Sequence, residues 1–207
     1  MSEPARENCN SMKNSFLFLA DGFEEIEALT AVDVLRRAEI PVKTVSITSS
    51  LQVKGAHGII VTADVIYDNT LFADSEWLIL PGGMPGASNL YEFAPLQGLL
   101  EQQYESETGR IAAICAAPAV VLGQLGLLKG HEATCYPGFE GMLDGAEVKD
   151  SPVVADNKYV LGNGPSNALK WALAIVAATK GVHVADHVAN SMLLYNSQDG
   201  STVNFFG

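Results

Sequence analysis

Basic residues are scarce in this chain, which argues against proteins that bind nucleic acid or anionic membranes. Twelve Lys and Arg stand against 24 Asp and Glu in 207 residues, so the formal net charge is -12. No run of Lys or Arg offsets this charge, and we therefore expect neither nucleic acid nor an anionic membrane surface as a partner. No apolar stretch approaches the roughly 20 residues that span a bilayer, so no membrane segment is expected.

Cysteine is also scarce. The three cysteines, Cys9, Cys115 and Cys135, are an odd number without the spacing of a disulfide framework. This usage favours a reducing compartment, and we expect a cytoplasmic protein. The first residues are polar and lack the apolar core of a secretory signal. We expect an N-terminal tail over residues 1–13, a single domain over 14–195 and a C-terminal tail over 196–207.

Short apolar segments alternate with amphipathic helical patterns along the whole domain. This alternation predicts an α/β fold, with a mostly parallel, doubly wound sheet and helices on both faces. We expect a hairpin at residues 153–161 and strands over 15–20, 42–47, 59–65, 77–80, 110–114 and 132–135. We expect helices over 24–38, 95–106, 116–128, 167–180 and 184–194, the fourth with Ser166 as its N-cap.

Cys115 stands at the junction of a predicted strand and a predicted helix. Ligands of such sheets bind at the carboxyl ends of the strands, where a junction residue occupies a sharp turn. The free N–H groups and dipole of the following helix favour a thiolate, so we expect a lowered thiol pKa at Cys115. A buried structural cysteine fits the same local sequence and remains the alternative.

Three carboxylates, Glu24, Glu25 and Glu27, follow the first strand and should reach the same edge of the sheet. Like charges this close raise the pKa of one of them, and a protonated carboxyl could donate a hydrogen bond to a thiolate. Acidic residues in a first helical turn also stabilise the helix dipole, and we favour that simpler role for Glu24 and Glu25. Pro81-Gly82-Gly83 ends another strand, either as a bare turn or as a place where amides approach an oxyanion.

The histidines do not predict a metal site. His57 and His131 lie beside glycines in turns, and His183 and His187 are one helical turn apart without a third ligand. We therefore expect neither a metal nor a cofactor. Cys135 is interpreted as a bystander or a secondary oxidisable thiol.

Three segments together resemble a known family: DGFEEIEALTAVDVLRR, LILPGGMPGASNL and AAICAAPAVVL. In this order they are similar to the DJ-one/ThiJ/PfpI superfamily, and in particular to its branch of the Parkinsonism-associated protein deglycase. The segment NGPSNALKWALAIV resembles the same branch, so the resemblance covers about residues 13–194. It implies a flavodoxin-like three-layer sandwich, a homodimer and cofactor-free chemistry.

The resemblance also implies roles for individual residues. Cys115 would be the reactive nucleophile and Glu27 the protonated acid that hydrogen-bonds its sulfur. The oxyanion and substrate pocket would comprise Gly82, Gly83, Ala116, Glu24, Tyr136 and Pro165.

Two positions depart from the wider superfamily. Tyr136 stands where several members have a histidine near the cysteine, and tyrosine is a poor general base near neutral pH. Ala116 stands where the protease-like branch has a histidine, so peptidase activity is not expected. Two functions remain open: an enzyme acting on reactive dicarbonyls or their early glycation adducts, or a non-catalytic stress sensor or chaperone that works through Cys115 oxidation.

Overall fold

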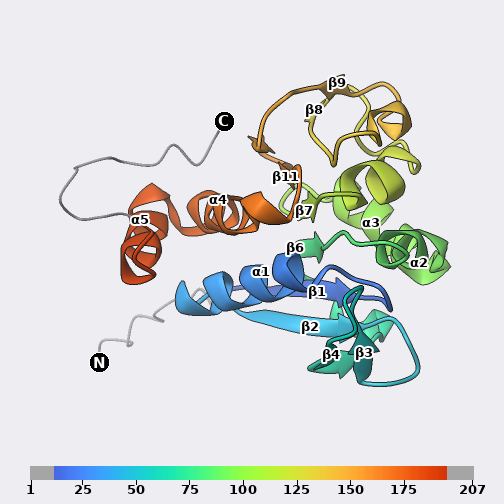
Figure 1. Cartoon of the computed structure of the whole chain (residues 1–207), viewed down its shortest axis with the longest axis horizontal. Coiled ribbons are helices and arrows are strands. Elements are labelled where there is room, and N and C mark those ends of the chain that lie inside the picture. Colours follow the sequence, from blue (N-terminus) through green and yellow to red (C-terminus); the bar gives the residue numbers. More distant parts are fainter. Residues whose placement is uncertain (1–11, 195–207) are drawn as a thin grey trace, which may run out of the picture.

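The computed structural model describes residues 12–194, and a seven-stranded sheet runs through its centre. In sheet order the strands are β10 (Val153–Ala155), β11 (Tyr159–Gly162), β7 (Arg110–Ile114), β6 (Ser75–Leu80), β1 (Asn14–Leu19), β2 (Val42–Ser46) and β5 (Val65–Ile66). All neighbours are parallel except β10 and β11, which form the predicted hairpin. The predicted α/β architecture is confirmed (Figure 1). The two expected tails lie almost entirely outside the described residues.

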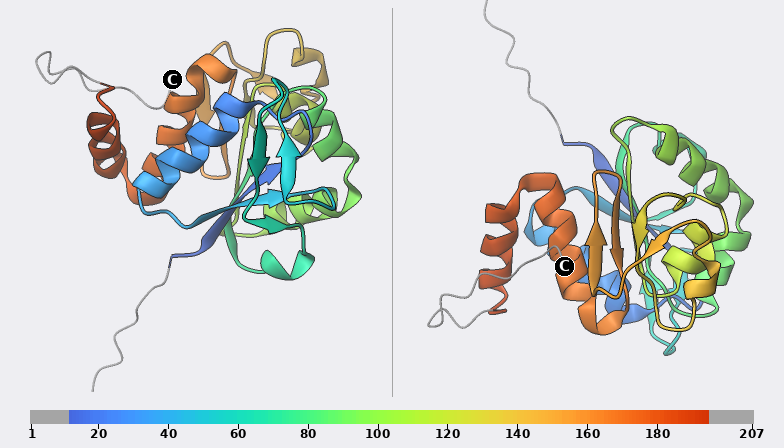
Figure 2. Two further views of the ribbon diagram at one scale, coloured as in Figure 1. Left: turned by 60° about the horizontal axis from the view of Figure 1, so that its bottom comes forward. Right: turned by 90° about the horizontal axis from the view of Figure 1, so that it is seen from above.

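Helices cover both faces of the sheet and make three layers. One face carries α1 (Glu25–Arg37), α4 (Ala168–Lys180) and α5 (Val182–Ser191), and Figure 2 shows α1 and α4 side by side there. The other face carries α2 (Gly86–Glu92), α3 (Ala94–Glu105) and the helical turn Pro118–Gly123.

Strand β1 shows why the sheet needs cover on both sides. Successive side chains of a strand point to opposite faces, so Leu17 and Leu19 enter the core under α1 and α4. Phe16 and Phe18 enter the core on the side of α2 and α3. All four are buried, which is the physical reason that the strand is an uninterrupted apolar run.

Two of the predicted strands lie largely outside the main sheet, which only Val65 of residues 59–65 joins, as the first residue of β5. Residues 59–65 contribute β4 (Ile60–Thr62), which pairs with β3 (Gln52–Lys54) in a separate hairpin. Residues 132–135 contribute only β8 (Glu132–Ala133), which pairs with β9 (Glu147–Val148) in another small sheet. Neither segment is apolar on both faces, as a central parallel strand must be.

Some helix predictions need correction too. The helix expected over residues 116–128 is a single π-helical turn, Pro118–Gly123, followed by further turns. Gly123 lies against the backbone of Met142, where an added Cβ would come within 2.3 Å of the carbonyl oxygen. Helix α2 was missed because its first residue, Gly86, follows Pro85 and resembles a turn. Ser166 is not the N-cap of α4, because a 3₁₀ turn, Pro165–Asn167, precedes that helix.

The remaining elements are short. They are the 3₁₀ turns Asn69–Leu71 and Glu140–Met142. No helix within residues 12–194 is both long and apolar enough to cross a membrane.

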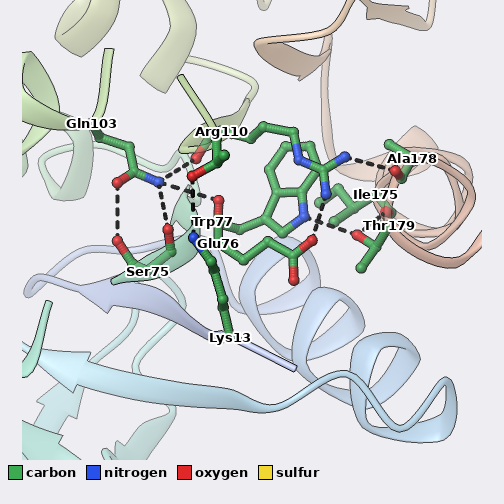
Figure 3. Close-up of polar contacts among 10 residues, drawn as sticks. Lys13, Ser75, Glu76, Trp77, Gln103, Arg110, Ile175, Ala178 and Thr179 are labelled. Carbon is green, nitrogen blue, oxygen red and sulfur yellow. Dashed lines mark hydrogen bonds and ion pairs between the residues drawn. The ribbon is translucent and has the colours of Figure 1, made fainter. Parts of the chain in front are cut away.

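A polar clamp closes the sheet at the amino ends of its strands (Figure 3). The guanidinium of Arg110, at the start of β7, donates hydrogen bonds to the Glu76 carboxylate and to the Ala178 carbonyl. It also stacks over the Trp77 ring, 4.5 Å from the ring centroid, and the indole N–H of Trp77 donates to Thr179 at 2.9 Å. The clamp therefore joins β6, β7 and the C-terminal end of α4.

We predict that Arg110→Met lowers the free energy of unfolding by about 1–3 kcal/mol, because Glu76 would be left partly buried without its cation. Lys13→Met is the matched control, since Lys13 pairs with Asp74 at the surface and such pairs contribute about 0–1 kcal/mol. Urea unfolding of both variants measures the difference. Equal losses would show that the clamp is no stronger than a surface ion pair.

Candidate active site

Cys115 lies in a sharp turn directly after β7. Its backbone has φ 65°, a left-handed conformation that is uncommon for a residue with a side chain. Two hydrogen bonds hold the turn: the N–H of Cys115 donates to Gly162 at 2.9 Å, and its carbonyl accepts from the N–H of Tyr136 at 2.8 Å. The side chain is 7% exposed, so the sulfur is covered and yet lies at the rim of the core.

Glu27 reaches this turn from the first turn of α1. Its side chain is fully buried, and Oε2 accepts the Gly82 N–H at 2.7 Å. The carboxyl group also contacts the Cys115 thiol, while Oε1 accepts no other hydrogen bond from the described residues. A buried carboxyl oxygen without a donor is less costly when it carries a proton.

Glu27 and Cys115 titrate as a coupled pair. Burial, aided by the charge of Glu24, raises the pKa of Glu27 to about 7, although the Gly82 N–H and the thiol oppose the shift. Burial, the charge of Glu27 and its hydrogen bond raise the pKa of Cys115 to about 12. Between these two pKa values the pair holds one proton, shared between oxygen and sulfur.

The expectation of a lowered thiol pKa is therefore wrong for Cys115. The amides of Gly83 and Ala116 do lower the pKa of the thiol, as a helix N-terminus was expected to do. Burial and the neighbouring carboxylate outweigh these two donors. Local sequence could not show this balance, because Glu27 is far from Cys115 along the chain.

The two glycines after β6 allow these groups to meet. An added Cβ at Gly82 would lie 2.7 Å from the Cβ of Cys115 and 2.9 Å from Oε2 of Glu27. Gly83 has φ 87°, and a Cβ there would lie 2.5 Å from the amide nitrogen of Glu24. A side chain at Gly82 would therefore push the sulfur and the carboxyl group apart, and one at Gly83 would displace the backbone just before α1.

The other predicted pocket residues surround the pair at different depths. Glu24 is the N-cap of α1, where Oε2 accepts the Glu27 N–H at 2.7 Å. The Tyr136 side chain is half exposed, and its ring lies against Gly164. Pro165 follows Gly164 and begins the 3₁₀ turn before α4.

Comparison with known proteins places the chain in a family. A profile of the DJ-1/PfpI family matches residues 13–178. The chain belongs to the DJ-1/PfpI family. It is 34% identical to protein DJ-1 homolog B of Arabidopsis thaliana over 187 residues, which are 89% of this chain and 42% of that protein. It therefore spans less than half of the length of that relative.

Other members of the DJ-1/PfpI family match over most of their length. Protein dj-1beta of Drosophila melanogaster is 34% identical, with 89% of this chain and 99% of that protein covered. A Caenorhabditis elegans protein named glutathione-independent glyoxalase DJR-1.2 is 33% identical, with 76% and 83% covered. The solved structure of oxidized DJ-1 from Toxoplasma gondii has a TM-score of 0.83 at 33% identity, with 87% and 98% covered. These matches confirm the predicted flavodoxin-like fold.

The structure adds one pair that the sequence did not indicate, Glu25 and His57. His57 lies at the tip of the β3–β4 hairpin, and its Nδ1 is 2.8 Å from Oε2 of Glu25. Glu25 is buried, so it does more than stabilise the helix dipole as expected. Only the tertiary fold brings these residues together, and no local pattern in the sequence could have revealed their contact.

The other thiol of residues 12–194 and the other histidines lie apart from this pair, and Cys9 lies outside the described residues. Cys135 packs in the core on the α2–α3 side, where burial raises the pKa of its thiol to about 11. His131 pairs with Asp156, and His183 and His187 lie on α5.

We predict that Glu27→Gln lowers the thiol pKa of Cys115, because the amide removes the repulsive carboxylate and can still donate to a thiolate. The ultraviolet absorbance of the thiolate, followed against pH, measures the shift, with Cys115→Ser providing the background of the other thiols. A higher pKa in Glu27→Gln would instead show that Glu27 keeps its proton and stabilises the thiolate in the native protein. An unchanged pKa would contradict the coupling.

Proposed function

We propose that this chain is a cysteine-dependent, cofactor-free enzyme that acts on reactive dicarbonyls or on their early glycation adducts. The observation that carries the proposal is the Cys115–Glu27 pair, with the amides of Gly83 and Ala116 directed at the sulfur. A family member named as a glutathione-independent glyoxalase supports this reaction class. Peptidase activity is not proposed, because Ala116 leaves no histidine directly after the cysteine.

The geometry supports a sequence of steps for methylglyoxal. The shared proton first moves from the Cys115 sulfur to Glu27. The thiolate then attacks the aldehyde carbon and forms a carbon–sulfur bond, while the carbonyl oxygen becomes an oxyanion. In this proposal the amides of Gly83 and Ala116, which act on the sulfur, stabilise that oxyanion before Glu27 donates its proton to it.

The second half of the reaction returns the enzyme to its starting state. Glu27 removes the proton from the former aldehyde carbon, the hydroxyl proton of that carbon passes to the neighbouring carbonyl oxygen, and a proton returns to the neighbouring carbon. These transfers convert the adduct into a thioester. Water then cleaves the carbon–sulfur bond, so lactate leaves and the thiol is restored. Methylglyoxal and water thus give lactate with no net oxidation, and no cofactor is consumed.

We predict that Cys115→Ala abolishes methylglyoxal consumption and that Glu27→Gln lowers kcat by about 10²-fold or more, since general acid–base groups contribute on that scale. The assay follows methylglyoxal loss together with lactate formation. Cys135→Ala is the control and should retain full activity, because the Cys135 thiol lies in the core on the α2–α3 side of the sheet. Equal rates for wild type and Cys115→Ala would reject the mechanism.

We also predict that Tyr136→His increases kcat, because an imidazole beside the Cys115 turn can transfer protons near neutral pH where a phenol cannot. The expected gain reaches about 10²-fold, the lower range of general acid–base catalysis. Tyr136→Phe is the matched control and should leave kcat near the wild-type value. A loss of activity in Tyr136→His would show that the ring at this position serves substrate binding instead.

A second candidate function is an oxidative-stress sensor. The same two amides could hold an oxidised sulfur, and the absence of a histidine at position 136 favours this role over fast turnover. In this case a peroxide oxidises the Cys115 thiolate in two steps to a sulfinate, each step adding one oxygen and releasing one water. Intact mass after mild peroxide treatment separates the two functions, since only the sensor requires two added oxygens at Cys115. No feature of the described residues specifically indicates a chaperone.

A further inference from the structure

Glu24, Glu25 and His57 form a cluster at the rim of the carboxyl edge of the sheet. Nδ1 of His57 is 2.8 Å from Oε2 of Glu25 and 3.9 Å from Oε1 of Glu24. One ligand atom from each residue lies within 4.8 Å of the other two. The carboxylates come from the start of α1 and the imidazole from the β3–β4 hairpin, so the cluster joins two elements that are distant in the sequence.

The cluster has too little positive charge for its acids. The side chains of Glu24 and Glu25 are 9% and 5% exposed, and burial of carboxylates is costly unless cations balance them. Among the described residues, His57 is the only cation within ion-pair distance of either acid. Its side chain is 69% exposed, and it carries at most one positive charge against two.

One oxygen in the cluster also has no donor. Oε2 of Glu24 caps α1 through the Glu27 N–H, but Oε1 accepts no hydrogen bond within residues 12–194. This oxygen belongs to a side chain that is more than nine-tenths buried, and it faces the imidazole of His57. It is therefore a ligand atom that no hydrogen-bond donor of residues 12–194 occupies.

The backbone holds Glu25 and the hairpin in place for a ligand. Oε1 of Glu25 accepts the N–H groups of His57 at 2.8 Å and of Ile59 at 3.4 Å, which leaves Oε2 directed at the imidazole. Gly55 makes this approach possible, because an added Cβ there would lie 2.2 Å from Oε1 of Glu25. The site is thus built by the fold before any ion binds.

We infer that Glu24, Glu25 and His57 bind a divalent transition-metal ion, with Zn²⁺ as the best match. An imidazole nitrogen with two carboxylate oxygens is a ligand set suited to zinc, whereas calcium and magnesium prefer oxygen alone. The ion enters between Nδ1 and the two oxygens that face it, Oε2 of Glu25 and Oε1 of Glu24, and replaces the direct contact of Nδ1 with Oε2. Any proton on Nδ1 is released to water. The expectation from the sequence was that no metal binds, and the inference does not depend on the proposed reaction at Cys115.

Isothermal titration of the full chain with zinc chloride tests the inference. We expect one Zn²⁺ per chain at this cluster and an affinity at least tenfold weaker in His57→Gln, because one of three protein ligands is lost. Glu24→Gln is a second variant that keeps the shape of the side chain and should also weaken binding. His131→Gln, which breaks a similar histidine–carboxylate pair with Asp156, is the matched control and should bind as wild type does.

The thiols are excluded as the origin of the signal by repeating the titration with Cys115→Ser, which should retain the affinity of the wild type. Circular dichroism establishes that each variant is folded. Binding that is equal in wild type and His57→Gln, binding lost only in Cys115→Ser, or no binding by the wild type would each overturn the inference. Because Cys115→Ser is inactive under the proposed function, retained zinc binding in it separates the two proposals.

Discussion

The hydrogen bond from the Gly82 amide to the buried carboxyl of Glu27 is the contact on which the site depends. It joins the first turn of α1 to the loop after β6, at 2.7 Å, inside a space where a single added carbon would not fit. Because one oxygen of Glu27 is occupied in this way, the group can neither rotate away nor reach solvent. The carboxyl must then face the sulfur of Cys115, and the proton that the pair retains becomes available for chemistry.

The polar groups at the amino ends and at the carboxyl ends of the strands differ in how well they are satisfied. At the amino edge, Arg110 joins neighbouring strands to α4 through an ion pair with Glu76, a hydrogen bond to the Ala178 carbonyl and the face of the Trp77 ring. At the carboxyl edge, Cys115 has an uncommon backbone conformation and Glu27 keeps an oxygen without a donor. Strain and unsatisfied polar groups of this kind persist only where the surrounding fold holds them in place.

Two further acidic residues, Glu24 and Glu25, connect the Cys115–Glu27 pair to the neighbouring helix and hairpin. Glu24 caps the helix that carries Glu27, and its charge contributes to the raised pKa of that residue. Glu25 holds the β3–β4 hairpin against the same helical turn through His57. Three carboxyl groups in four residues therefore have three different tasks, which their burial and their partners decide.

The sequence by itself determined the architecture and pointed to Cys115 and Glu27 as the candidate site. The uninterrupted apolar runs of β1, β6 and β7 can be buried only between two layers of helices, so the parallel sandwich follows from composition and order. Cys115 was predicted from its junction, and its partner Glu27 through the resemblance of three motifs. Only the tertiary structure decided the net direction of the pKa shift at Cys115 and which distant segments meet. The net rise of the thiol pKa, the meeting of Glu25 with His57, and the separate hairpin of β3 and β4 all depend on contacts between distant segments. Desolvation and charge–charge interaction act through space, and local sequence does not encode the distances on which they depend.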